Sequence, residues 1–96
     1  MNVVHDEQAR RFVASGPDGE GFLSYGVLEP SVLDFEYIEV PSRFRGTGVA
    51  GRIVQAACRH VRANGIRVVP TCPYIVWWFT QHPEERDLLL HRDTPA

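Results

Sequence analysis

Residues 40–51 read V-P-S-R-F-R-G-T-G-V-A-G, and they stand where one pattern of apolar residues gives way to another. Before Pro41, apolar and polar residues alternate, which is typical of a strand; after Gly48, apolar residues recur at helical spacing. Pro41 has no N–H to donate to a sheet, so it ends the strand. The stretch is therefore predicted to connect a strand directly to the N-terminus of a long helix.

This junction has the features of an anion-binding loop. The first turn of a helix leaves backbone N–H groups without partners, and the helix dipole adds roughly half a positive charge there. Gly46 and Gly48 put no Cβ in the way of a ligand, and arginines at 43 and 45 add positive charge. The combination predicts a phosphate site. Taken alone, the same glycines also fit a tight strand-to-helix turn.

Nucleotide and dinucleotide sites are disfavoured by the spacing of this loop. The Walker pattern G-x-x-x-x-G-K-[ST] is absent from the sequence. Gly51 falls one position away from the third glycine of the pattern G-x-G-x-x-G. No acidic residue follows a second strand where a ribose contact would need it.

Three strands are predicted before the junction, at residues 10–14, 22–28 and 32–40. The turn signals G-P-D-G-E-G and E-P-S separate them, so they form an antiparallel meander. In the third strand, alternation predicts one face with Leu33, Phe35 and Tyr37. The other face is expected to be partly solvated and to carry Val32, Asp34, Glu36, Ile38 and Val40.

After the junction, a helix is predicted from Val49 to about Asn64, ended by Gly65. A short buried strand follows at residues 66–69, then helices over residues 73–81 and 84–90. The order β-β-β-α-β-α-α predicts a mixed α/β sheet, an antiparallel meander followed by a βαβ unit with parallel strands.

The composition of the 96 residues is that of one ordinary globular domain, residues 1–96, with 44% hydrophobic and 23% charged residues. A net charge of −2 excludes a strongly basic nucleic-acid binder. No apolar run approaches the ~20 residues of a membrane span, and the N-terminus carries charges where a secretory signal is apolar. We therefore expect a cytoplasmic protein with neither nucleic acid nor membrane as partner. Cysteine and histidine spacings predict no disulfide framework and no metal site.

Two motifs together resemble a known family. R-G-T-G-V-A at 45–50, after E-V-P at 39–41, fits the [QR]-x-x-G-x-[GA] signature of the GNAT superfamily of N-acetyltransferases. P-T-C-P-Y at 70–74 and H-P-E at 82–84 resemble its compact single-domain branch. The resemblance covers about residues 20–90 and implies a GNAT-like acyl-CoA N-acyltransferase fold.

The resemblance implies acetyl-CoA as cofactor. Loop N–H groups at 45–50 would hold its pyrophosphate, and the strand at 38–40 would diverge through a bulge from its parallel neighbour at 66–69. The pantetheine arm would lie in that gap, and the Val40 N–H would face the thioester carbonyl. The residues expected to contact the cofactor are Ile38, Val40, Arg45, Gly46, Thr47, Gly48, Val49, Ala50 and Cys72.

Three residues are candidates for acid–base chemistry. Glu39 is the first candidate for general base, its alternative being a solvated strand glutamate. Tyr37 shares its face and stands where the compact branch often has histidine; a phenol is a poor base because its pKa is about 10. Cys72 precedes a helix, so it is a candidate acetyl acceptor, proton donor or lining residue, or simply a small buried side chain. Tyr74 is a candidate acid.

The remaining aromatic and sulfur residues are interpreted mainly as structural. Of Trp77 and Trp78, which point about 100° apart on a helix, one is expected in the core and one over the cofactor arm or an interface. Cys58 is expected in the core, and His82 is interpreted as a helix cap. The arginines at 52, 59 and 62 are interpreted mainly as a solvated helix face, although Arg52 lies near enough to the loop to meet a CoA phosphate.

The sequence is best interpreted as an acetyl-CoA-dependent N-acetyltransferase in which an amine of unknown identity attacks the thioester directly. No helical pair separates the first two predicted strands, so the acceptor site is expected to be open or completed by a second subunit in a homodimer. The acceptor is then an amine on a small molecule or a protein. The alternatives are a non-catalytic CoA or acyl-CoA binding module and a protein-interaction domain that uses the tryptophans.

Overall fold

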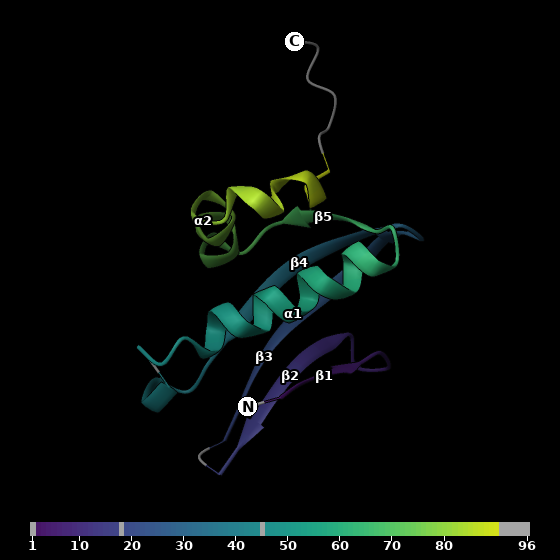
Figure 1. Cartoon of the computed structure of the whole chain (residues 1–96). Coiled ribbons are helices and arrows are strands. Elements are labelled where there is room, and N and C mark those ends of the chain that lie inside the picture. Colours follow the sequence, from purple (N-terminus) through teal and green to yellow (C-terminus); the bar gives the residue numbers. More distant parts are fainter. Residues whose placement is uncertain (1, 18, 45, 91–96) are drawn as a thin grey trace.

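The computed structural model describes residues 2–17, 19–44 and 46–90, which form a five-stranded sheet with helices packed against it (Figure 1). The strands are β1 (Val3–Asp6), β2 (Arg11–Gly16), β3 (Gly19–Glu29), β4 (Val32–Glu39) and β5 (Arg67–Pro70). The helices are α1 (Val49–Ala63) and α2 (Pro73–Gln81), with the short 3₁₀ helices η1 (Ser42–Phe44) and η2 (Pro83–Leu88). The strands lie side by side in chain order.

The predicted mixed sheet is confirmed. Strands β1 to β4 pair in antiparallel fashion, and β4 pairs with β5 in parallel through the crossover helix α1. Two further elements, β1 and η1, were absent from the sequence prediction. Within the described residues, no helix is long and apolar enough to cross a membrane.

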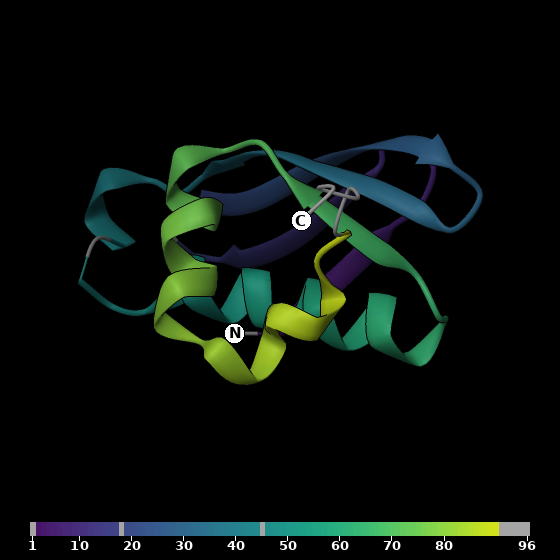
Figure 2. The ribbon, with the colours of Figure 1, turned by 90° about the horizontal axis from the view of Figure 1, so that it is seen from above.

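Both helices lie on the same face of the sheet (Figure 2). The buried stripe of α1 packs onto β2 and β3, and it consists of Val49, Ile53, Val54, Ala57, Cys58 and Val61. Helix α2 packs beside α1, since a Cβ built on Gly51 would lie 3.5 Å from Trp78 Nε1. Among the described residues, no element covers the opposite face, where Tyr37 is 49% exposed. Within the described residues this face of the sheet is therefore open.

A bulge in β4 corrects the predicted faces of this strand. Tyr25 pairs with Phe35 but the preceding Ser24 pairs with Tyr37, so Glu36 is an extra residue. One extra residue shifts the alternation of all that follow. Tyr37 therefore turns to the open face instead of sharing the buried face of Phe35, and Ile38 turns towards the core.

Strand β1 is held to the rest of the fold by an aromatic cluster around His5. The His5 Nε2 lies 2.7 Å from the Tyr25 hydroxyl, and its ring stacks on Phe12 at 4.3 Å. The same ring contacts the edge of His60 on α1, with centroids 4.3 Å apart. Burial first, and then the neighbouring His60, lower the pKa of His5 below its ordinary value of 6.5.

This cluster predicts an acid-sensitive attachment of β1. The folded-state pKa of His5 is lowered, so the unfolded chain binds the proton more tightly, and stability is lost as pH falls below 6.5. We expect His5→Phe, which keeps an aromatic ring on Phe12, to lose less stability than the wild type between about pH 7 and about pH 5. Urea midpoints at both pH values measure this. Equal losses in the two proteins would contradict the assignment.

Candidate functional site

Strands β4 and β5 separate partway along their length. Their pairing runs from Val32 opposite Arg67 to Phe35 opposite Pro70. The Phe35 carbonyl then accepts hydrogen bonds from the N–H groups of both Thr71 and Cys72, at 3.0 and 3.3 Å. Beyond this point the chain after β5 enters α2, while β4 continues to Glu39. The expected divergence of the parallel strands is confirmed, and it leaves the end of β4 without a parallel partner strand among the residues that the structure describes.

The N-terminus of α1 opens beside this gap. Gly46 and Gly48 have positive φ angles of 78° and 82°, and a Cβ on either would meet nothing within 4 Å. Gly48 is the N-cap residue, the helix receives no side-chain cap, and no acidic residue stands in its first turn. The Thr47 hydroxyl bonds to the Phe44 carbonyl and so closes the loop on itself. The first N–H groups of α1 are thus uncapped by side chains and positioned to bind an anion.

A cavity of about 570 Å³ joins the strand gap to this helix end. Its size is that of a small-molecule site. The lining residues are Ile38, Val40, Phe44, Gly46, Gly48, Ala50, Gly51, Tyr74 and Trp77. We call it the β4–α2 cavity.

The structure brings most of the expected cofactor residues to this cavity, but not all of them. Five line it, namely Ile38, Val40, Gly46, Gly48 and Ala50. Thr47 is not a lining residue, and the side chains of Val49 and Cys72 belong to the core cluster. Arg45 lies outside the described residues. Phe44 and Gly51 also line the cavity but were not predicted from the sequence, although a glycine inside an amphipathic helix is itself a signal of close approach. At Gly51 two atoms of α2 approach a built Cβ, Trp78 Nε1 at 3.5 Å and the Tyr74 hydroxyl at 3.8 Å.

On the helix side of the gap, α2 contributes a phenol and an indole. Tyr74 and Trp77 line the cavity, with ring centroids 5.6 Å apart. Burial, and then nearby Cys72, raise the pKa of Tyr74 above its ordinary value of 10, so its hydroxyl keeps a proton at neutral pH. Trp77 is 53% exposed and Trp78 only 3%, which confirms that one of the pair packs into the core. His82 caps α2 and stacks on Trp78 at 3.9 Å.

On the opposite, open side of β4, Tyr37 and Glu39 form a hydrogen-bonded pair. The Tyr37 hydroxyl donates to Glu39 Oε1 at 2.8 Å. This bond, more than any other influence, raises the pKa of Tyr37 above 10, which agrees with the expectation that Tyr37 is a poor base. The end of β4 therefore presents Ile38 and Val40 to the cavity and Glu39 to solvent.

Cys72 lies at the point where the two strands separate. It is the N-cap of α2, is only 8% exposed, and influences the pKa values of both Tyr37 and Tyr74. Cys58, in contrast, lies on the buried stripe of α1, and burial raises its pKa to about 12. Cys58 is thus structural, as expected, whereas Cys72 borders the gap from within the core.

Comparison with known proteins agrees with this geometry. A family model described as GCN5-related N-acetyl-transferase matches residues 11–88. Protein NATD1 of Bos taurus is 29% identical over 85 residues, which cover 86% of this chain and 75% of the relative. Protein NATD1 of Danio rerio is 27% identical over 95 residues, covering 95% of this chain and 86% of the relative.

A solved structure has the same fold. The NMR solution structure of a GCN5-like protein from Staphylococcus aureus superimposes with a TM-score of 0.74. The similarity covers 96% of this chain and 90% of that chain, at 15% sequence identity. At this identity the likeness establishes the arrangement of the strands and helices.

The Tyr37–Glu39 pair makes a direct prediction about phenol titration. Glu39→Gln removes the carboxylate that holds the phenolic proton, so the pKa of Tyr37 is expected to fall towards its ordinary value of about 10. Ultraviolet titration of the phenolate measures this change, and Tyr37→Phe identifies which component belongs to Tyr37. Glu36→Gln is the matched control and should leave that component in place. An unchanged Tyr37 titration in Glu39→Gln would contradict the pairing in solution.

Proposed function

The chain belongs to the GCN5-related N-acetyl-transferase family, and from this premise we propose that it is an acetyl-CoA-dependent N-acetyltransferase. The observation that carries the proposal is the β4–α2 cavity, which runs from the uncapped N-terminus of α1 into the gap between β4 and β5. Its acceptor would be an amine on a small molecule or a protein.

The residues present fit the cofactor. Gly46 and Gly48 leave open space at the helix end where a diphosphate would accept backbone N–H bonds. Beyond Phe35, the backbone of β4 has no parallel partner strand in the described part of the chain, so the amides of a pantetheine arm can pair with it. Phe44 and Trp77 supply apolar lining for the rest of the arm. Bound there, acetyl-CoA would supply an acyl group activated as a thioester.

Glu39 is the residue we assign to remove the proton from the acceptor amine, directly or through a water molecule. It stands on the open face of the sheet, on the other side of β4 from Ile38 and Val40. An amine can reach this face because, among the described residues, no helix covers it. We assign the Val40 N–H to the thioester carbonyl oxygen, where a donor typically contributes about 10²–10³ in rate.

Tyr74 is the residue we assign to protonate the departing sulfur. It lines the cavity, and its raised pKa keeps the hydroxyl protonated at neutral pH. Cys72 borders the same gap but is buried, so we assign it to shaping the site. With Cys72 in this role, acetyl transfer from bound acetyl-CoA would form the amide bond and break the thioester bond in one direct exchange, without an acetyl-cysteine.

A non-catalytic acyl-CoA binding module is the second candidate. It is favoured by the orientation of Glu39, which faces away from the cavity that Ile38 and Val40 line. Such a module would bind CoA through the same cavity but would not transfer acetyl to any amine. Both candidates therefore require CoA to bind in the cavity, and only the enzyme requires amine-dependent turnover.

Cofactor binding is tested with two glycine variants that carry the same backbone strain. Gly48→Ala and Gly65→Ala both place a Cβ at positive φ, 82° and 67°, which costs about 1–2 kcal/mol of stability in either case. Only Gly48 lines the cavity. We expect the wild type to bind CoA with a micromolar Kd, about −8 kcal/mol. Gly48→Ala should bind roughly tenfold more weakly, a loss of about 1.4 kcal/mol, and Gly65→Ala as tightly as the wild type, by isothermal titration calorimetry. No heat with millimolar CoA would reject both candidate functions.

Catalysis is tested by amine-dependent consumption of acetyl-CoA over a panel of amines. General acid–base groups contribute roughly 10²–10⁴ in rate, so Tyr74→Phe and Glu39→Gln should each lower kcat by about 10²-fold or more without loss of CoA affinity. Tyr25→Phe and Glu36→Gln are the matched controls and should keep the wild-type kcat. A chain that binds CoA but shows no amine-dependent turnover would be the binding module instead.

A further inference from the structure

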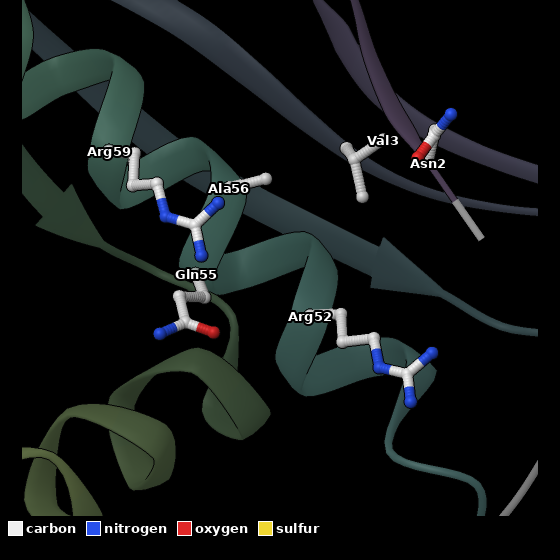
Figure 3. Close-up of a pocket in the computed structure, with 6 residues that line it drawn as sticks. All are labelled: Asn2, Val3, Arg52, Gln55, Ala56 and Arg59. Carbon is white, nitrogen blue, oxygen red and sulfur yellow. The ribbon is translucent and has the colours of Figure 1, made fainter.

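A second hollow, of about 560 Å³, lies between α1 and the beginning of β1 (Figure 3). Its lining residues are Asn2, Val3, Arg52, Gln55, Ala56 and Arg59. We call it the β1–α1 groove. It shares helix α1 with the β4–α2 cavity but no lining residue. None of its lining residues carries a negative charge, and two carry a positive one.

The two arginines of the groove have no partner among the described residues, whereas a third arginine of the same helix is fully engaged. Arg62 donates two hydrogen bonds to Asp87, at 2.8 and 2.9 Å, and one to Glu85 at 3.0 Å. No hydrogen bond or ion pair is found for Arg52 or Arg59 within residues 2–17, 19–44 and 46–90. The carboxylates of η2 thus neutralise one guanidinium of α1, and the two in the groove stay exposed.

The local sequence keeps this part of α1 positive. An acidic residue at position 55 or 56 would pair with Arg52 or Arg59 across one helical turn, but Gln55 and Ala56 stand there. Arg52 also lies near the N-terminal turn of α1, where the helix dipole disfavours a cation and no acidic residue offsets it. Such a departure from local stability is typical of a position selected for binding.

We propose that the β1–α1 groove binds a phosphate-bearing ligand through Arg52 and Arg59. The fork of a guanidinium matches phosphate oxygens in a bidentate way, and Gln55 and Asn2 add neutral donors between and opposite the arginines. The arginines are seven residues apart, about 10 Å along the helix axis, which suits a ligand with more than one anionic group. This inference does not depend on the proposed acetyltransferase activity.

The phosphate has two possible sources. Arg52 follows Gly48 by one helical turn, so the groove is near enough to take the terminal phosphate of a cofactor held at that loop. The other source is a separate phosphorylated molecule. Both sources have the same recognition chemistry, and the experiment distinguishes them.

Sodium tripolyphosphate is the probe, titrated calorimetrically into the whole chain. Arg59→Gln, which lies far from the glycine loop, should weaken its binding roughly tenfold, and Arg52→Gln/Arg59→Gln roughly a hundredfold. Arg10→Gln/Arg86→Gln removes the same charge from two other exposed positions and should bind as the wild type does. Thermal unfolding verifies that all variants are folded. Absence of tripolyphosphate binding, or equal weakening in both double variants, would overturn the proposal.

Coenzyme A and dephospho-CoA then identify the source of the phosphate. If the groove takes the cofactor's terminal phosphate, the wild type prefers CoA to dephospho-CoA, and the groove double variant loses this preference. If the ligand is separate, the preference is unchanged in the double variant while tripolyphosphate binding is still lost. Gly48→Ala should weaken CoA binding but leave in place the part of tripolyphosphate binding that the groove double variant loses, so failure of the proposed function and failure of this inference give different results.

Discussion

The Phe35 carbonyl accepts the last backbone hydrogen bonds between β4 and the segment that follows β5. It accepts two N–H groups, from Thr71 and Cys72, at the point where pairing with Pro70 ends. Neither Pro70 nor Pro73 has an N–H to extend the ladder, and Pro73 starts α2. The P-T-C-P segment thus turns the chain out of the sheet and leaves a gap in it. The β4–α2 cavity exists because the two parallel strands separate here.

The bulge at Glu36 determines what the two sides of the gap present. Without the extra residue, Tyr37 would share the buried face of Leu33 and Phe35, and Ile38 would face solvent. With it, Ile38 and Val40 line the cavity while Tyr37 and Glu39 stand on the open face. A ligand lying within the plane of the sheet would therefore meet apolar side chains and Tyr74 on one side and a carboxylate on the other.

The junction at 40–51 could be predicted from sequence because its signals are local. A strand-ending proline, two glycines and an amphipathic helix each depend only on neighbouring residues, and all were found in place. The bulge could not be predicted from the alternation of β4, because the register that reveals it is set by β3. The four residues of β1 were missed for a similar reason: they are held by distant groups, Tyr25 and His60, and four residues give too short a pattern to recognise.

The same distinction, between local sequence signals and contacts set by distant elements, explains the cavity residues. Some that line the cavity were not predicted, and some that were predicted do not line it. Val49 and Cys72 belong to the sequence motifs, yet both side chains point into the core, because a motif that binds through its backbone need not expose its side chains. Phe44 and Gly51 lie just outside the motif positions but line the cavity, since Phe44 ends η1 next to the glycine loop and α2 packs closely on Gly51.

Because the domain is small, helix α1 has several structural and binding roles. One stripe of the helix fills the core, its N-terminus faces the β4–α2 cavity, and Arg62 attaches η2 through Asp87 and Glu85. To attach η2, Arg62 must be paired with these two carboxylates. Arg52 and Arg59 lie on the remaining face and are left unpaired among the described residues, although an acidic side chain at position 55 or 56 would have paired with one of them. Structural stability therefore accounts for the charge at position 62 but not for the charges at 52 and 59.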